Sequence, residues 1–240
     1  VVKNVTGYDL SKLICGAFGT LVALTEITLK VLPKKQLSNT IVIKVEDRKK
    51  IYDLFDKIAS SSSEITGAVF LPDEPDDGLF VKNKETIFKF NDLNFTGSYL
   101  ALRLEGDKVS INEKTKKITK ELDLNKFKIA ILDNYQSSPF WKKINNLELF
   151  QNTKNNLLRI VIEPANGSEM MSYLGNKFKY YIDWCGSLFW VEVPPKKNNK
   201  VSEIKKKSIE LGGYMTIVKT SEEYDYEETI FTVEPVRVMI

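Results

Sequence analysis

The stretch GYDLSKLICGAFGTLVALTEITLKV, residues 7–31, interrupts an apolar run with three glycines and changes its periodicity part-way. Asp9 is placed to cap a helix whose apolar residues follow helical spacing and which ends near Gly16. Apolar residues then alternate with others from Thr25 to Pro33, which predicts a half-buried strand. The segment GAFGT, residues 16–20, is therefore predicted to connect a helix to a strand.

The overall composition is that of a soluble globular protein. The chain has 240 residues, of which 42% are hydrophobic and 28% are charged, so it can bury a sizeable core. The net charge is only +3, and lysines far outnumber the arginines that a nucleic-acid surface uses to bind phosphates and bases. We therefore expect no nucleic-acid partner.

Cysteine and histidine limit the chemistry further. Two cysteines, Cys15 and Cys185, cannot form a disulfide framework, and no apolar run reaches membrane-spanning length, so we expect a cytoplasmic protein. Histidine is absent, which excludes imidazole metal sites and Ser–His or Cys–His pairs. We expect no metal site, and the sequence assigns no catalytic residue. The missing initiator methionine and the apolar end suggest a piece of a longer protein.

The rest of the chain alternates strand and helix signals joined by short loops, after a predicted linker at 33–36. Strands are predicted at 39–47, 64–72, 98–106, 126–133, 156–164, 179–184, 187–194 and 214–220, and helices at 48–61, 108–122, 138–147 and 200–213. This antiparallel-prone order predicts an α+β sandwich of ferredoxin-like units.

The glycines of GAFGT have two interpretations. In the first, Gly16 ends the helix and Gly19 makes a tight bend, both at positive φ. In the second, the glycines let backbone N–H groups approach an anionic or flat ligand, and Thr20 adds a hydroxyl group.

Three motifs in a fixed order favour the second interpretation. They are KNV-GYDL at residues 3–10, G-x-x-GTL at 16–21 and TE-x-T-LKVLP at 25–33. With them the chain resembles the second FAD-binding segment of flavoproteins of the vanillyl-alcohol-oxidase type, in particular the FAD-binding subunit of bacterial glycolate oxidases. Looser matches, such as YLALRLEG and LLRIVIEP, continue the resemblance through the cap domain.

The resemblance implies a fold and a cofactor, FAD. Residues 1–35 would be the C-terminal part of a PCMH-type FAD-binding domain, and residues 36–240 an α+β cap domain whose C-terminus is incomplete. The glycines would lie against the flavin or its pyrophosphate, where a Cβ would collide. The implied cofactor-binding residues are Asn4, Gly7, Tyr8, Asp9, Gly16, Gly19, Thr20, Ala23 and Leu24. Asp9 has an alternative role as the helix cap, and Tyr8 has one as a core residue.

The resemblance also implies a function, in which the chain takes part in the oxidation of glycolate to glyoxylate. Its partners would be a catalytic flavoprotein subunit and an iron–sulfur subunit, with at most peripheral association with the inner membrane. Related catalytic subunits carry a His-rich metal motif in the cap, and its absence here favours an auxiliary role. Two alternatives stay open: a stand-alone FAD-dependent 2-hydroxy-acid dehydrogenase of the D-lactate type, and a cofactor-free α+β interaction module.

Three further features have ordinary structural explanations. Trp184-Cys185-Gly186 could hold a reactive thiol or a cysteinyl flavin link, but a small residue buried between strands is favoured because no basic partner is adjacent. The acidic segment PDEPDDG, residues 72–78, lacks calcium-loop spacing and is predicted to be a solvated loop. The lysine-rich helices at 114–120 and 196–207 are predicted to present solvated faces.

Overall fold

The structure is a computed structural model that describes residues 9–17, 19–75, 97–195 and 199–222. Its internal contacts divide the chain into two units, residues 1–34 and 35–240. The boundary between the units falls within the segment that the sequence predicts to be a linker.

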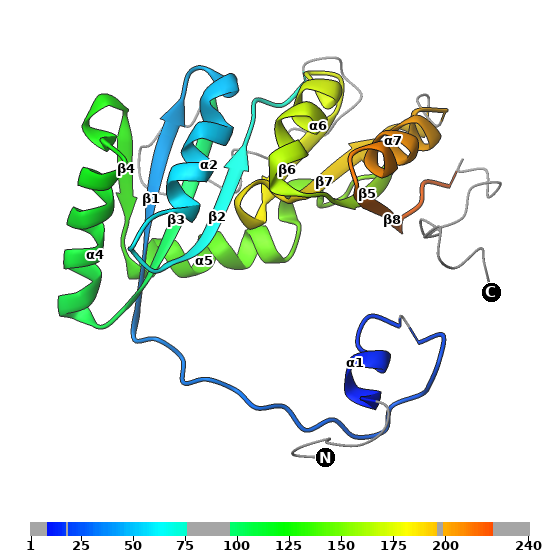
Figure 1. Ribbon diagram of the computed structural model, residues 1–240, viewed down its shortest axis with the longest axis horizontal. Helices are drawn as coiled ribbons and strands as arrows, with labels where there is room; N and C mark the ends of the chain where they lie inside the picture. Colours follow the sequence, from blue (N-terminus) through cyan, green and yellow to red (C-terminus); the bar gives the residue numbers. More distant parts are fainter. Residues whose placement is uncertain (1–8, 18, 76–96, 196–198, 223–240) are drawn as a thin grey trace. The chain divides into compact units, whose positions relative to one another are not determined.

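The described part of the first unit contains the helix α1, Leu10–Ile14 (Figure 1). Asp9 is its N-cap, and the Asp9 side chain accepts a hydrogen bond from the backbone N–H of Lys12 at 3.3 Å. The chain leaves the helix through Gly16, which has a φ of +83°. The helix and both of its ends therefore follow the sequence prediction.

The strand predicted from Thr25 to Pro33 is wrong for this structure. These residues form no strand, and their apolar side chains are exposed, Leu29 by 75%. An extended segment becomes a strand only when a neighbouring strand takes up its backbone hydrogen bonds, and no described strand pairs with this one. GAFGT therefore follows a helix but leads into an unpaired extended segment.

The second unit is built on an eight-stranded sheet. Its first half contains β1 (Leu37–Val45), α2 (Ile51–Ala59), β2 (Ile65–Leu71), β3 (Ser98–Gly106), α4 (Lys108–Glu121) and β4 (Ile129–Leu132). The helix α5 (Asn134–Asn145) follows. The second half contains β5 (Asn156–Val161), α6 (Gly167–Leu174), β6 (Lys179–Asp183), β7 (Leu188–Val193), α7 (Asn199–Glu210) and β8 (Tyr214–Lys219).

Every strand and helix predicted for this region is present, and α6 is an addition to the prediction. This helix has only eight residues, too few to display a clear helical period in the sequence. Its buried side chains, Met170, Met171 and Leu174, join the core that the other elements form.

The strand order confirms the α+β class and the ferredoxin-like units. Along the sheet the order is β4-β1-β3-β2-β6-β7-β5-β8, and the paired strands are antiparallel. Each half follows a βαββαβ path, and its four strands take the same order when each half is read from its outer edge. The two halves meet where β2 pairs with β6 at Phe70–Ile182. We call this boundary the seam.

Helices cover both faces of the sheet (Figure 1). α2, α4, α6 and α7 lie on one face, where they enclose a core with strand residues such as Ile41 and Phe189. α5 lies on the opposite face, over strand residues such as Val42, Val69 and Tyr181. Because successive strand residues point to opposite faces, the continuous apolar run of β1 supplies both cores.

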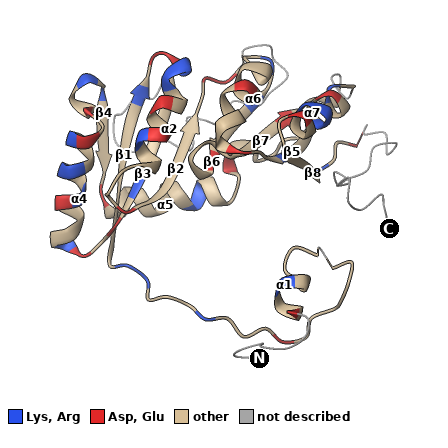
Figure 2. Ribbon diagram, in the orientation of Figure 1, with Lys and Arg blue, Asp and Glu red and all other residues tan. Residues whose placement is uncertain are grey.

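The outer helices α4 and α7 carry lysines interspersed with carboxylates (Figure 2). On α4, Lys116 Nζ lies 3.0 Å from Glu113, and on α7, Lys200 Nζ lies 2.7 Å from Glu203. Such pairs, three residues apart on an exposed helix surface, are solvated and only weakly stabilising. The described parts of these helices are therefore solvated faces, as predicted.

The loop after β2 differs from its predicted solvated state. Glu74 is largely buried, and its carboxylate lies 3.0 Å from Nζ of Lys179, a lysine of β6 that is only 1% exposed. A buried ammonium group needs an anionic partner, and this partner comes from PDEPDDG. Residues 76–78 of that segment lie outside the described residues.

Candidate functional site

The predicted flavin contacts of the first unit lie around α1 and the turn that follows it. Asp9 already has a structural role, because it caps α1 and its carboxylate lies 3.2 Å from Lys12 Nζ. The hydrogen bonds and the charge of Lys12 lower the pKa of Asp9. Asn4, Gly7 and Tyr8 lie outside the described residues, so their predicted contacts stay predictions.

Gly16 and Gly19 both have the positive φ that the sequence predicts, +83° and +74°. A Cβ built on either glycine would meet no heavy atom within 4 Å. The collision that the sequence predicts for a Cβ at Gly16 or Gly19 therefore involves no described part of this chain. Among the described residues, the backbone N–H groups of both glycines also donate no hydrogen bond to the chain. Open space beside free N–H groups is what an anionic group or a ring edge needs for a close approach, so these residues fit the phosphate or ring of FAD.

The remaining predicted residues of this segment are also on its surface. The Thr20 hydroxyl donates to the Ala17 carbonyl at 2.6 Å, so it first of all stabilises the turn. Ala23 and Leu24 are exposed, together with Leu21 and Val22. The structure thus brings Gly16, Gly19 and Thr20 together in one turn, while Ala23 and Leu24 follow it without contacts that fix them.

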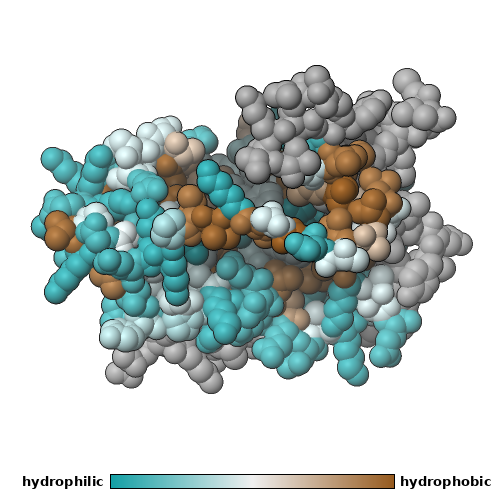
Figure 3. Space-filling model, turned by 90° about the horizontal axis from the view of Figure 1, so that it is seen from below, coloured by the Kyte–Doolittle hydropathy of each residue, from teal (hydrophilic) through white to brown (hydrophobic). Residues whose placement is uncertain are grey.

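Large apolar side chains are unusually exposed in the first unit. They are Leu10, Leu13, Leu21, Val22, Leu24, Ile27, Leu29, Val31 and Leu32. Hydrophobic surface of this kind is visible in brown in Figure 3. So many exposed apolar side chains in a segment of about 25 residues indicate that another protein surface or a ligand covers this segment.

The second unit contains a groove beside the seam, with a volume of about 510 Å³. Its walls come from the end of α2, the first residues of β2, one residue of β3, the end of α5 and the turn after β6. The lining residues include Asp183, Trp184 and Cys185 at the end of β6 and in the turn after it, and Arg103 and Trp141 from β3 and α5. Among the described residues, no group of histidine, cysteine and carboxylate side chains could hold a metal ion.

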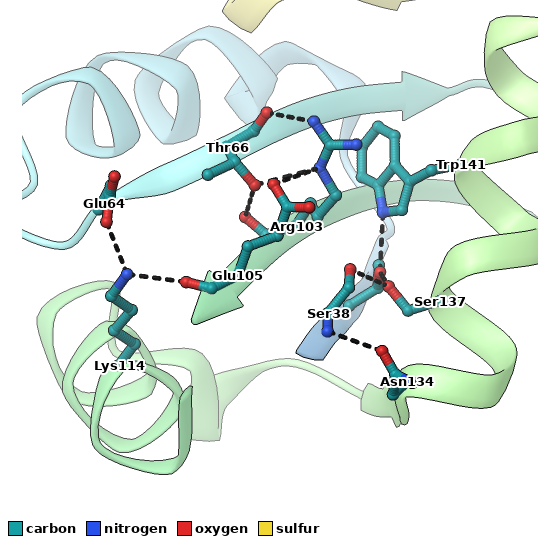
Figure 4. Close-up of polar contacts among 10 residues, drawn as sticks. Ser38, Glu64, Thr66, Arg103, Glu105, Lys114, Asn134, Ser137 and Trp141 are labelled. Carbon is teal, nitrogen blue, oxygen red and sulfur yellow. Dashed lines mark hydrogen bonds and ion pairs between the residues drawn. The ribbon is translucent and has the colours of Figure 1, made fainter. Parts of the chain in front are cut away.

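Arg103 is held in one orientation by β2 (Figure 4). Its Nη2 donates to the Thr66 carbonyl at 2.7 Å, its Nε donates to the Thr66 hydroxyl at 3.1 Å, and Glu105 lies 3.5 Å from Nε. The guanidinium carbon lies 5.0 Å from the centroid of the Trp141 ring, a cation–π contact. Gly67 permits this stacking, because a Cβ there would lie 3.1 Å from the Trp141 ring.

Trp141 is fixed in turn by a chain of hydroxyl groups between α5 and β1 (Figure 4). Its Nε1 donates to the Thr40 hydroxyl at 2.8 Å, and that hydroxyl lies 2.7 Å from the Ser137 hydroxyl. Ser137 also contacts Ser38, whose backbone N–H donates to the Asn134 side chain at 3.0 Å. The wall formed by Arg103 and Trp141 is therefore rigid before any ligand binds.

The turn after β6 contains three consecutive residues at positive φ. Trp184, Cys185 and Gly186 have φ values of +50°, +52° and +101°. Such a conformation is strained for tryptophan and cysteine, and it persists only where the surroundings enforce it. Tyr52 on α2 contributes, because its hydroxyl donates to the Gly186 carbonyl at 3.1 Å and its ring leaves no space for a Cβ at Gly186. The turn holds the Trp184 side chain 56% exposed, with the Arg159 guanidinium 5.2 Å from its ring centroid.

Two titratable groups lie in and beside this turn. Burial raises the pKa of the Cys185 thiol to about 11, and the nearby carboxylates of Asp183 and Asp56 contribute. Burial also raises the pKa of Asp183, against the lowering effects of the Trp184 N–H and the Arg103 guanidinium. Cys185 is thus the partly buried, protonated residue that the sequence favoured over a reactive thiol.

Arg103, Trp141 and Asp183 were not predicted as site residues from the sequence. Gly67 inside a predicted strand was the available signal, because a glycine there indicates close approach by another group. It could not say which group, since the contact partner Trp141 lies more than 70 residues away along the chain.

Comparison with known proteins bears on the whole chain. No protein-family model matches it. Glycolate oxidase subunit GlcE of Escherichia coli (strain K12) is 29% identical over 217 residues, which cover 90% of this chain and 48% of that protein. This chain is similar to glycolate oxidase subunit GlcE. The match confirms the resemblance drawn from the motifs. The glycolate oxidase subunit GlcD of Bacillus subtilis (strain 168) is 33% identical over 72 residues, which cover 30% of this chain and 14% of that protein.

The chain thus spans about half the length of GlcE. Among solved structures, p-cresol methylhydroxylase with substrate bound gives a TM-score of 0.49 at 10% identity, covering 80% of this chain and 47% of that one. The 4-ethylphenol oxidase of Gulosibacter chungangensis gives 0.48 at 9% identity, covering 80% and 47%. Within the residues that the structure describes, no helix has both the length and the apolar character to cross a membrane.

Proposed function

We propose that this chain is part of the FAD-binding subunit of a glycolate oxidase-type complex. The observation that carries the proposal is the similarity to GlcE over 217 residues, which cover 90% of the chain. Residues 1–35 are proposed to complete a PCMH-type FAD-binding domain, and residues 36–240 to form its cap. When bound, FAD would carry electrons that are released in the complex as glycolate becomes glyoxylate.

Gly16 and Gly19 are proposed to bind the cofactor through their backbone N–H groups. Both groups are free of hydrogen bonds to the described chain, and both glycines adjoin open space. Thr20 holds the turn, and Asp9 fixes the helix in front of it. Asn4, Gly7 and Tyr8 are proposed to line the same pocket, with Ala23 and Leu24 in contact with its edge.

An auxiliary role is proposed for this subunit within the complex. The chain has no histidine, so it offers no imidazole to bind a metal or to take a proton from a 2-hydroxy acid. Substrate oxidation then belongs to a catalytic flavoprotein subunit, and an iron–sulfur subunit passes electrons onward. The complex is proposed to be cytoplasmic, with at most peripheral contact with the inner membrane.

The cofactor site can be tested by measuring the flavin content of the protein in the form that its organism produces. Gly19→Ala is expected to lower bound FAD severalfold, because the Cβ would occupy the space beside the proposed N–H contact. Gly212→Ala is the matched control, since Gly212 also has a positive φ, +72°, and open space around its Cβ position. Equal flavin content in the two variants would leave only the turn interpretation of GAFGT.

Purification of the same protein through an affinity tag tests the complex. We expect a larger flavoprotein and a cysteine-rich iron–sulfur protein to co-purify with it. Rapid glycolate oxidation by the isolated subunit with an artificial electron acceptor would contradict the auxiliary role. Rapid D-lactate oxidation by it would favour the stand-alone dehydrogenase instead.

A further inference from the structure

The groove at the seam presents polar groups whose hydrogen-bonding capacity is only partly used. Nη1 of Arg103 donates no hydrogen bond to the described residues, whereas Nε and Nη2 are both engaged by Thr66. Asp183 accepts from the Trp184 N–H through Oδ1, at 2.8 Å, while its Oδ2 has no hydrogen bond to the described chain. The Asn145 side-chain amide, at the end of α5, is exposed and has no side-chain hydrogen bond to the described residues. The groove therefore offers a cationic donor, an anionic acceptor and a neutral amide.

The groove also offers a flat aromatic surface. The Trp184 ring is more than half exposed and is held outward by a strained backbone. Strain at a bulky residue costs stability, and it is found where a function depends on the orientation of that residue. The Arg159 guanidinium lies over one face of this indole ring, so a planar ring would stack on its other face.

We propose that this groove binds a purine or pyrimidine base that carries a lactam edge, such as hypoxanthine, guanine or uracil. A lactam edge places a carbonyl acceptor next to an N–H donor. Arg103 Nη1 and the Asn145 amide donate to the carbonyl, Asp183 Oδ2 accepts from the N–H, and the ring stacks on Trp184. The groove volume of about 510 Å³ lies in the range of small-molecule sites and accommodates a nucleoside.

With ligands of other classes, either Arg103 or Asp183 would face a group of like charge, or a donor would face a donor or an acceptor an acceptor. A carboxylate on Arg103 would face the carboxylate of Asp183, and an ammonium on Asp183 would face the Arg103 guanidinium. Adenine presents an unprotonated ring nitrogen where the lactam has its N–H, so an acceptor would face the acceptor Asp183. The remaining carboxylate at the rim, Glu64, is paired with Lys114 at 2.7 Å.

Calorimetric titration of the 240-residue chain with nucleosides tests the proposal. Inosine carries the lactam edge, 1-methylinosine lacks only its N–H, and adenosine replaces the edge. We expect inosine to bind, and we expect the affinity of each of the other two nucleosides to be lower by a factor of about ten or more. A site that hydrogen-bonds an N–H group discriminates against its loss. Absence of binding at millimolar inosine, or equal binding of the three nucleosides, would overturn the proposal.

Asp183→Asn gives a readout that a structural role would not produce. The variant keeps an oxygen for the Trp184 N–H but turns the acceptor toward the ligand into an amide donor. An amide donor opposes the lactam N–H, so the preference for inosine over adenosine is expected to disappear, while adenosine should not gain affinity because its amino group still faces the Arg103 donor. An unchanged preference would count against the assignment of Asp183.

Trp184→Gly separates binding from stability. Glycine adopts a positive φ freely, so the relieved strain offsets part of the lost contact with Arg159, and this variant is expected to stay folded while it abolishes inosine binding. Asp123→Gly is the matched control, because Asp123 has a φ of +51° and lies outside the groove lining. It should leave inosine binding unchanged. Inosine binding that survives in Trp184→Gly would refute the stacking platform.

Discussion

Cys185 shows how burial decides the chemistry of a single side chain. The thiol lies in a wall of the groove, where burial and the neighbouring carboxylates raise its pKa to about 11. The thiolate is the reactive form of cysteine, so almost none of it is present near neutral pH. Cys15, in contrast, is exposed on the surface of the first unit.

Alkylation should therefore distinguish the two cysteines. Brief treatment of the folded chain with iodoacetamide near neutral pH is expected to modify Cys15 and to leave Cys185 free. Peptide mass spectrometry locates the label, and the same reaction in denaturant, where both thiols should react, is the control. Equal labelling in the folded chain would mean that Cys185 is more accessible than the structure indicates.

Glu192 is a second residue whose environment sets its protonation. It is only 1% exposed, and Oε1 accepts hydrogen bonds from the Thr153 hydroxyl and from Asn155, while Oε2 has no partner among the described residues. Burial raises the pKa of Glu192, despite these hydrogen bonds and the charge of Lys179. The folded state therefore binds the proton more tightly than the unfolded state, so stability is lost as the pH rises above the unfolded value of 4.5.

Glu192→Gln should remove this pH-dependent loss. The amide keeps the acceptor oxygen for Thr153 and Asn155, and it has no charge to desolvate. The melting temperature of the variant is expected to exceed that of the native chain at pH 8, with the difference shrinking toward pH 4. The gain is the free energy that desolvation of the ionised carboxylate costs the folded state, so it grows as the pH rises above 4.5.

Glu203→Gln is the control for that substitution. Glu203 is exposed, and its hydrogen bond from Lys200 lowers its pKa, so the control should give a small effect of opposite sign. A larger loss of stability in Glu192→Gln at pH 8 than at pH 4 would contradict the prediction.

At the scale of elements, α5 is tied to the sheet by polar contacts as well as by its core residues. The hydrogen bond from Trp141 Nε1 to Thr40 spans 101 residues of sequence and is buried. The Thr40 hydroxyl also contacts Ser137, and the Asn134 side chain accepts from the Ser38 N–H, so α5 reaches β1 through three of its side chains. Loss of one member of this network leaves a buried hydroxyl with fewer partners.

Trp141→Phe is thus expected to lower the free energy of unfolding by about 1–3 kcal/mol, measured by urea denaturation. Trp190→Phe is the matched control, because Trp190 is only partly buried and its indole makes no hydrogen bond to the described residues. Equal effects of the two substitutions would show that the Thr40 contact adds nothing beyond ring packing.

The elements also show what the sequence can and cannot predict. Alternating residues and helix caps are local signals, so β3 was predicted with its observed bounds and Asp9 was predicted as a cap. The segment at 25–33 carries the same alternation but lacks a partner strand here, which no local pattern can reveal. The predicted turn glycines have the expected φ, whereas the groove depends on Arg103, Trp141 and the strained Trp184, which meet only through tertiary packing.

At the scale of the whole molecule, the first unit is the part with the least internal support. Its apolar side chains are exposed, and the chain covers only 48% of the relative GlcE. The resemblance implies that a further lobe binds much of the cofactor. In such a site, the charge-assisted hydrogen bonds that hold a pyrophosphate contribute about 1.5–3 kcal/mol each.

The 240-residue chain on its own is therefore expected to retain no FAD. After incubation with FAD and gel filtration, its absorbance spectrum should lack the flavin bands, whereas a longer chain that restores the preceding lobe should be yellow. Stoichiometric flavin binding by residues 1–240 would show that the cap holds the cofactor. In that case, the proposed division of roles between residues 1–35 and 36–240 would be wrong.

The seam between β2 and β6 has a consequence for how the chain reaches its folded state. β1, β3 and β4 pair within the first half, and β5, β7 and β8 pair within the second, while the halves join at Phe70–Ile182. Each half can therefore nucleate from its own nearby stretch of chain, at a lower loop-closure cost than a sheet whose neighbours alternate between the halves. Strand pairing within each half is therefore expected to precede the pairing of β2 with β6, and the two cores, which both contain residues of both halves, are completed only when the halves meet.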